Sequence, residues 1–293
     1  ADTRPRDLSD AQAAVLRELG QLVERELGLV DLIHAQRELL ETKNALVRSQ
    51  QRLAEELTEA AEYVRSLLPD RLSGELETDW RFFSSSQLGG DAFGYHWLDD
   101  DRLAIYLLDV TGHGTGAALL SISVINMLRS QALASDCGGC PHNILDELNR
   151  AFPMEEHGEK FFTIWCGVYH RSDRRLDWAG AGHPAAVLAP RDGRDPTPLR
   201  SQGMVIGVKE DAEYTSDAID LAAGQRLYVF SDGVFEVPDP DGRMLGYDEF
   251  VKLLCEPPTN GKPRLDHAVE RVRRWQNSEH FADDFSLLEV AFG

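Results

Sequence analysis

The first 68 residues carry a hydrophobic pattern with a seven-residue period. Residues 9–68 contain no proline and only two glycines, and they are rich in leucine, glutamate, alanine, arginine and glutamine, which are good helix formers. This composition predicts a helical segment. The period is carried by Leu32, Leu39, Leu46, Leu53, Ala60 and Leu67, each followed directly by a second apolar residue.

A sustained seven-residue repeat is typical of a helix that packs along a partner helix. A helix over residues 30–68 would be about 58 Å long, which is more than one domain can cover. We therefore expect an intermolecular coiled coil; the alternative is a single amphipathic helix lying on its own domain. Residues 9–27 are predicted to form a separate, shorter helix that ends at Gly28. Together, residues 1–68 are predicted to be a helical linker for dimerisation and signalling.

Residues 69–293 differ from the linker because short β-rich runs alternate with turns of glycine, proline and aspartate. The strands mostly connect through hairpins, and the helices come in pairs. This order favours one α+β domain of antiparallel sheets covered by helices over a doubly wound parallel sheet. Strands are expected at 103–108, 161–169, 185–188, 226–230 and 285–290, and helices near 116–134, 142–151, 247–255 and 265–276.

The chain is strongly acidic, with 50 acidic and 30 basic side chains and a net charge of -20. Such a surface repels phosphodiester backbones and anionic lipid, so we expect neither nucleic acid nor a membrane as a partner. No run of about 18 apolar residues is present, and four cysteines are too few for a disulfide framework. A cytoplasmic location is expected. The chain begins at Ala1 rather than at a methionine, consistent with a fragment of a longer polypeptide or a processed product.

The segment from Gly89 to Gly114 predicts a β-hairpin that brings two carboxylates together. Two β-like runs flank a turn of three aspartates centred on Asp100, which pairs residues whose numbers sum to 200. Asp91 then lies opposite Asp109. Carboxylates on directly opposed residues, with Cβ atoms about 5 Å apart, repel each other unless a cation lies between them. The alternative is a pair of solvated strand-end aspartates beside turn glycines.

Further aspartates stand at the ends of two other apolar runs. Asp232 follows the run 227–230, and Asp283 and Asp284 precede the run 285–290. Carboxylate ligands without histidine or cysteine suit a hard cation such as Mg²⁺ or Mn²⁺ rather than Zn²⁺. Two such ions a few ångströms apart can activate a bridging water for attack on phosphorus. The sequence therefore predicts a metal site that acts on phosphate esters.

The order of these motifs resembles the metal-dependent PPM (PP2C-like) serine/threonine phosphatases, specifically the bacterial SpoIIE/RsbU branch. The resemblance covers essentially all of 69–293. The motifs that carry it are Gly89-Gly90-Asp91, Asp109-Val110-Thr111-Gly112-His113-Gly114, Phe162-Thr163, Ala181-Gly182-His183-Pro184, Ser231-Asp232-Gly233 and Asp283-Asp284.

The resemblance implies an α-β-β-α sandwich with two Mn²⁺ or Mg²⁺ ions at one end, where a bridging hydroxide attacks the phosphoserine or phosphothreonine. Asp109 would bridge both ions, the Val110 carbonyl oxygen would be a ligand, and Asp91 would serve the second ion. Asp232 and Asp283 would hold the first ion, and Asp284 would bind a third, weaker ion or orient Asp283. Members of the family commonly carry a further acidic residue where this chain has Gly94, so no ligand is expected there.

The resemblance also implies the partners. The substrate would be a phosphorylated STAS-domain anti-sigma-factor antagonist in bacterial partner-switching signalling, and the linker would transmit a signal from an upstream receiver or sensor domain. One rival is a non-catalytic scaffold that uses the same fold to bind a phosphoprotein. A second rival is a two-metal nuclease, which would need a basic groove that this acidic chain lacks.

Two histidines and a cysteine pair leave alternatives open. His113 would donate a proton to the leaving oxygen or bind phosphate, or else be a neutral structural histidine. His183 is expected to be a turn residue. Cys137 and Cys140, with His142, resemble half of a zinc site, but no second pair of cysteines completes it within the chain.

Overall fold

The computed structural model describes residues 9–85, 88–130, 139–191, 195–257 and 261–293. Residues 10–66 form one helix, α1 (Asp10–Ser66). The prediction that a first helix ends at Gly28 is wrong, because Gly28 keeps helical backbone angles and is not among the glycines with positive φ. A single glycine costs a helix only about 1 kcal/mol, too little to interrupt so many favourable neighbours.

The chain divides by its contacts into residues 1–58 and residues 59–293. The first unit consists of α1 up to residue 58, where large apolar side chains such as Leu39, Leu46 and Leu53 are exposed. The second unit holds the last turns of α1 and all the strands. Within the described residues, no helix is long and apolar enough to cross a membrane.

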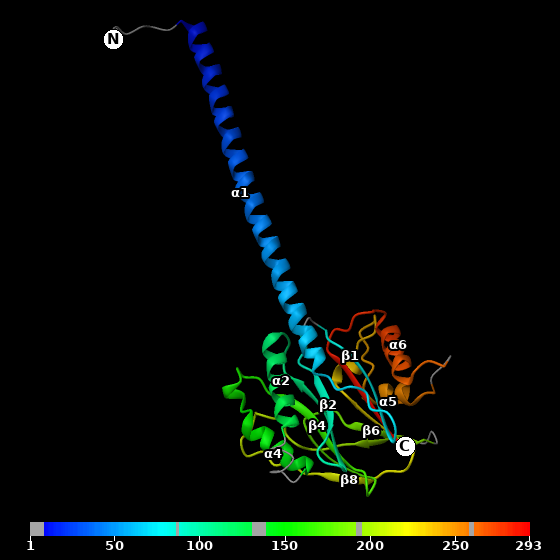
Figure 1. Ribbon diagram of the computed structural model, residues 1–293. Coiled ribbons are helices and arrows are strands. Elements are labelled where there is room, and N and C mark those ends of the chain that lie inside the picture. The colour runs from blue at the N-terminus through cyan, green and yellow to red at the C-terminus, as the bar shows by residue number, and fades with distance from the viewer. Residues whose placement is uncertain (1–8, 86–87, 131–138, 192–194, 258–260) are drawn as a thin grey trace. The chain divides into compact units, whose positions relative to one another are not determined.

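The second unit is built on two five-stranded antiparallel sheets (Figure 1). In the first sheet the strand order is β1 (Leu76–Phe83), β10 (Phe285–Phe292), β9 (Arg226–Phe230), β6 (Ala186–Ala189) and β7 (Thr197–Leu199). In the second sheet it is β2 (Ala92–Trp97), β3 (Arg102–Val110), β4 (Phe162–His170), β5 (Arg175–Ala181) and β8 (Asp217–Asp220).

Three apolar cores hold the layers together. Between the sheets, side chains such as Ile105 and Trp165 from the second sheet meet Val229 and Leu288 from the first. Helices cover the outer faces (Figure 1). The second sheet carries α2 (Thr115–Arg129) and α4 (Pro141–Ala151), and the first carries α5 (Tyr247–Cys255) and α6 (Arg264–Gln276). The predicted α-β-β-α sandwich is confirmed.

Alternation of side chains explains why the sandwich forms. Successive residues of a strand point to opposite faces, so β3 sends Ile105 and Leu107 into the space between the sheets and Tyr106 and Leu108 under the helices. Both faces of β3 are buried, so this strand reads as a nearly continuous apolar run. The described residues also form two short 3₁₀ helices, Met154–Glu156 and Asp232–Val234, and the second of them begins at a predicted metal ligand.

Candidate metal centre

The β2–β3 hairpin has the predicted register. Ala92 pairs with Leu108 and Tyr95 with Ile105, so the paired numbers sum to 200. Asp91 directly precedes β2, and Asp109 is the penultimate residue of β3. The two aspartates therefore meet at one end of the hairpin.

Asp91 is buried, with only 2% of its surface exposed. Its Oδ2 atom accepts a hydrogen bond of 2.5 Å from the Ser286 hydroxyl on β10. Burial raises the pKa of Asp91 well above its ordinary value, and the charges of Asp109 and Asp284 raise it further. A cation beside Asp91 would relieve this cost, because it favours the ionised carboxylate.

Asp109 lies at the electrostatic centre of the cluster. Burial raises its pKa from 3.8 to about 7, and the negative charges of Asp232, Asp283 and Asp284 contribute in the same direction. These four carboxylates come from the end of β3, the 3₁₀ helix after β9 and the turn before β10. The tertiary structure therefore brings together the strand ends that the sequence singled out.

Asp232 begins the 3₁₀ helix after β9. Burial raises its pKa, followed in size by the charges of Glu236 and Asp283. Glu236, which no sequence motif singled out, is one turn beyond Asp232 and near enough to repel its carboxylate. Its signal was weak, since a glutamate four residues after an aspartate is common on any helical segment.

The neighbouring residues Asp283 and Asp284 have different environments. Asp283 is exposed, whereas Asp284 is buried and its carboxylate is saturated with hydrogen bonds. Oδ1 of Asp284 accepts from the Ser84 hydroxyl at 3.1 Å and from the amide and hydroxyl of Ser85 at 2.8 and 3.0 Å. Oδ2 accepts from the amides of Gly90 and Asp91 at 2.7 and 3.3 Å. Asp284 thus ties the start of β10 to the loop that carries Asp91.

Glycines allow the loops of the site to approach one another. A Cβ atom on Gly90 would lie 2.5 Å from the carbonyl oxygen of Val110, and one on Gly89 would lie 2.1 Å from Oδ2 of Asp284. Any side chain would push these carboxylates and this carbonyl apart. At Gly94, by contrast, a Cβ would lie 2.6 Å from the hydroxyl oxygen of Tyr106, so the Tyr106 ring occupies the space of a side chain at that position.

The donor set fits a hard divalent cation. All the clustered side chains offer carboxylate oxygens, and three of them have raised pKa values because they are buried beside like charges. In the described part of the chain, no three histidine, cysteine or acidic side chains are already arranged as a complete set around one ion. Bound ions would draw these carboxylates together, and water would complete the coordination, as is usual for Mg²⁺.

The two histidines of the motifs lie in different environments. His113 is exposed in the glycine-rich loop before α2, and its ring makes no hydrogen bond within the described residues. His183 is half-buried two residues after the end of β5, where its Nδ1 atom is 2.8 Å from the Thr163 hydroxyl oxygen. Burial lowers the pKa of His183 to about 3, so it is neutral at physiological pH. His183 therefore links its own motif to that of Thr163, and it adds no charge to the carboxylate cluster.

The cysteine pair falls partly outside the described residues, because Cys137 is not among them. Cys140 is an exposed free thiol that precedes α4. The Nδ1 atom of His142 lies 2.8 Å from the Ser216 hydroxyl, a contact that accounts for this ring without a metal.

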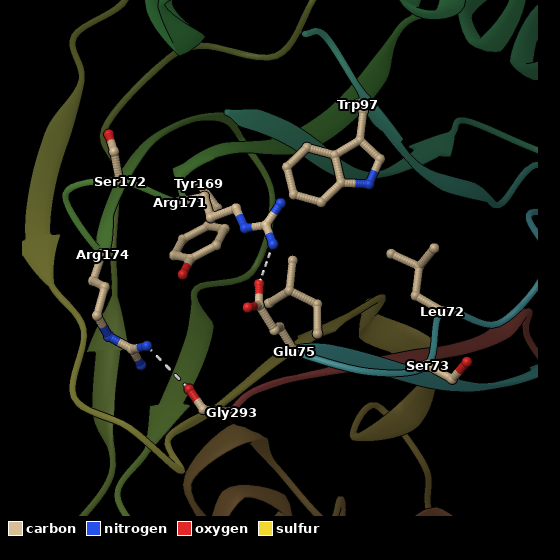
Figure 2. Close-up of a pocket in the computed structure, with 10 residues that line it drawn as sticks. Leu72, Ser73, Glu75, Trp97, Tyr169, Arg171, Ser172, Arg174 and Gly293 are labelled. Atoms are coloured by element: carbon tan, nitrogen blue, oxygen red, sulfur yellow. Dashed lines mark hydrogen bonds and ion pairs between the residues drawn. The ribbon is translucent and has the colours of Figure 1, made fainter. Parts of the chain in front are cut away.

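A separate hollow of about 600 Å³ lies at the opposite ends of the strands from the carboxylates. Figure 2 shows it between Trp97, Tyr169 and Glu75, with Arg171 paired to Glu75. Arg174 donates a hydrogen bond of 3.0 Å to the carbonyl oxygen of Gly293. Since protein groups already engage both guanidinium groups, this hollow offers no chemistry comparable to that of the aspartates.

The sequence profile of the family Stage II sporulation protein E (SpoIIE) matches residues 99–293. The chain belongs to the SpoIIE family. The predicted resemblance to the PP2C-like serine/threonine phosphatases is thereby confirmed.

Phosphoserine phosphatase RsbP of Bacillus subtilis (strain 168) is 29% identical over 232 residues, which cover 77% of this chain and 55% of RsbP. Phosphoserine phosphatase RsbU of the same organism is 26% identical over 243 residues, which cover 82% of this chain and 70% of RsbU.

Solved structures share the SpoIIE-type fold. The SiaA-PP2C domain of Pseudomonas aeruginosa superposes with a TM-score of 0.72 at 22% identity, covering 84% of this chain and 99% of that domain. RsbX, determined in complex with magnesium, superposes with a TM-score of 0.56 at 14% identity, covering 76% of this chain and 99% of RsbX. The chain spans about half the length of RsbP, so the matched part is one portion of that longer relative.

Proposed function

We propose that this SpoIIE-family chain is a metal-dependent protein phosphatase that hydrolyses phosphoserine or phosphothreonine. The observation that carries the proposal is the convergence of four aspartates, Asp91, Asp109, Asp232 and Asp283. Burial and neighbouring negative charges raise the pKa values of Asp91, Asp109 and Asp232. A phosphoprotein-binding scaffold has no need for mutually repelling carboxylates. The names of RsbP and RsbU, both phosphoserine phosphatases, support the same reaction.

The expected ligands divide between two metal ions. Asp109 would contact both ions, with Asp91 and the Val110 carbonyl oxygen on one side and Asp232 and Asp283 on the other. When bound, Mg²⁺ or Mn²⁺ would lower the pKa of a water molecule and neutralise the phosphoryl oxygens. The hydrogen bonds that saturate Asp284 favour an orienting role for this residue over a third metal site.

The substrate is proposed to be a phosphorylated STAS-domain anti-sigma-factor antagonist in partner-switching signalling. The support is the resemblance to the RsbU branch. The acidic surface of the chain also excludes competing polyanionic substrates such as nucleic acids. A phosphoprotein carries far fewer phosphates than a nucleic acid, so an acidic surface repels it less.

Dimerisation through α1 is proposed as the means of control, with a receiver or sensor domain upstream. The exposed leucines repeated every seven residues along α1 support a coiled coil. Within the second unit, the end of the linker contacts the catalytic domain. Arg129 of α2 donates a hydrogen bond of 2.7 Å to the Leu67 carbonyl oxygen, and Val64, Leu67 and Asp91 line one small cavity. A shift of the C-terminal end of α1 would therefore change the contacts beside the loop that carries Asp91.

The decisive assay measures phosphate release from a phosphorylated STAS-domain protein in the presence of Mn²⁺. Asp109→Asn and Asp232→Asn should each lower turnover at least a hundredfold, whereas Asp217→Asn, on exposed edge strand β8, should retain it. Wild-type turnover in both site variants would reject the metal assignment. Phosphoprotein binding without turnover by the wild-type chain would favour the scaffold.

A further inference from the structure

We propose that Lys160 binds the phosphoryl group of the substrate beside the metal centre. This inference deepens the proposed phosphatase function and rests on it. Lys160 lies outside the motifs that identified the family. It precedes β4 by two residues, at the same end of the second sheet as Asp109.

The backbone next to Lys160 is fixed to the metal-site loop. The Phe161 carbonyl oxygen accepts hydrogen bonds from the amide of Thr111 at 3.0 Å and from its hydroxyl at 2.9 Å. The Phe161 amide lies 3.2 Å from the same hydroxyl and donates to it. Thr111 is only two residues beyond Asp109. The backbone next to Lys160 is thus fixed to the segment that directly follows Asp109.

The side chain of Lys160 runs along the glycine-rich loop between β3 and α2. Its Nζ atom lies 3.6 Å from the position that a Cβ atom would take on Gly112, and its Cε atom lies 3.0 Å from the corresponding position on Gly116. The lack of side chains at these two glycines leaves room for the lysine. The ammonium group therefore lies beside the loop that joins the Asp109 ligand to the first turn of α2.

Among the residues that the structure describes, no carboxylate pairs with the Lys160 ammonium group. Within the described residues Lys160 makes no ion pair, whereas Lys209 pairs with Asp211 and Lys262 pairs with Glu270. This is notable at the edge of an acidic cluster, where a carboxylate partner would be easy to find. The charge of Lys160 thus stays available for an anion that enters from solvent.

The charge balance of the site calls for such a cation. Two divalent ions would only offset the four aspartates expected to hold them. A phosphate monoester brings about -1.5 to -2 at neutral pH, which would leave the loaded site negative. A lysine is a compact positive charge suited to phosphate oxygens, and in a partly water-excluded site its attraction exceeds that in bulk water.

The test compares Lys160→Met with Lys160→Arg and with a control lysine, Lys209→Met. The first measurement is titration calorimetry of inorganic phosphate into the Mn²⁺-loaded protein. Lys160→Met should weaken phosphate binding about tenfold, whereas Lys160→Arg and Lys209→Met should stay within about threefold of the wild type. Unchanged melting temperatures would establish that the variants are folded. Unaltered phosphate affinity in Lys160→Met, or no phosphate binding by the loaded wild type, would overturn the inference.

Kinetics separate this inference from the proposed function. With a phosphoprotein substrate, Lys160→Met should lower kcat/KM about tenfold or more, in part through a higher KM. The Mn²⁺ concentration for half-maximal activity should stay unchanged. A wild-type chain that binds phosphate through Lys160 yet hydrolyses no phosphoprotein would contradict the phosphatase proposal alone. If the wild type hydrolyses the phosphoprotein and Lys160→Met has the same kcat/KM, the phosphatase proposal stands and only the role of Lys160 is contradicted.

Discussion

The hydroxyl of Ser286 donates a hydrogen bond of 2.5 Å to the carboxylate of Asp91, although 195 residues separate them in the chain. Ser286 is fully buried in β10, and its amide donates a hydrogen bond of 3.2 Å to the Ser231 hydroxyl oxygen. The hydrogen bond favours the ionised form of Asp91, against the burial that raises its pKa. Ser286 therefore prepares Asp91 to meet a cation.

Replacing Ser286 by alanine should weaken Mn²⁺ binding about tenfold. A hydrogen bond to a charged group contributes about 1.5–3 kcal/mol, and without it the proton competes more strongly with the metal for Asp91. Calorimetric titration with Mn²⁺ measures the effect. Ser123→Ala, which removes an exposed hydroxyl from α2, is the matched control. Equal Mn²⁺ affinities in the two variants would contradict the role of Ser286.

The metal-free protein should lose stability as the pH rises from about 4 to about 7. Burial beside Asp232 and Asp283 raises the pKa of Asp109 from 3.8 to about 7, so across this window the folded protein holds a proton that the unfolded chain has released. The stability that this proton contributes is complete below about pH 4 and is lost by about pH 7. Chelator-treated protein should accordingly melt several degrees lower at pH 7.5 than at pH 5.

The same melting curves contain their own control. Asp109→Asn removes the titrating group, so its melting temperature should depend less on pH over this range. Mn²⁺ should stabilise the wild type more at pH 7.5 than at pH 5, because the metal displaces the proton. A wild-type melting temperature that rises from pH 5 to pH 7.5 without metal would count against a cluster of raised pKa values.

Alanine substitutions of the neighbours Asp283 and Asp284 should affect stability and Mn²⁺ binding differently. Asp284→Ala removes the acceptor of hydrogen bonds from Ser85 and Gly90, so we expect it to lower the free energy of unfolding by about 2–4 kcal/mol. Asp283→Ala changes an exposed side chain and should alter that free energy by less than about 1 kcal/mol while it lowers Mn²⁺ affinity. Urea unfolding without metal, followed by Mn²⁺ titration, tests both. If Asp283→Ala destabilised the protein more than Asp284→Ala, Asp284 would not be the residue that holds the start of β10 to the Asp91 loop.

The linker prediction concerns one face of α1. Changing Leu39, Leu46 and Leu53 together to lysine should turn a dimer into a monomer, because charged residues in a coiled-coil seam lose their apolar contacts. The matched control changes Glu41, Arg48 and Glu55 to lysine, since these residues have the same spacing on another face of the helix. Light scattering measures the mass of each variant. A wild type of monomer mass would reject the coiled coil.

The sequence alone was sufficient for features that depend on nearby residues. The turn around Asp100 and the alternation of the two flanking strands determine the hairpin register, which places Asp91 beside Asp109. Strands such as β9 were predictable because a short apolar run ends at a polar turn. Strand β1 was missed because Asp79 and Arg81 interrupt its apolar pattern, and these residues pair with each other on the partly exposed edge of the sheet.

Only the tertiary structure decided how the strand ends combine. The hydrogen bond from Ser286 to Asp91, the saturation of Asp284 and the approach of Lys160 to Gly112 all join residues far apart in the chain. Such contacts depend on how two sheets pack face to face, which short-range patterns of polarity do not specify. The acidic residues and their positions at strand ends were therefore readable from the sequence. Which of them face solvent, and which are held by buried hydroxyls and amides, follows from packing.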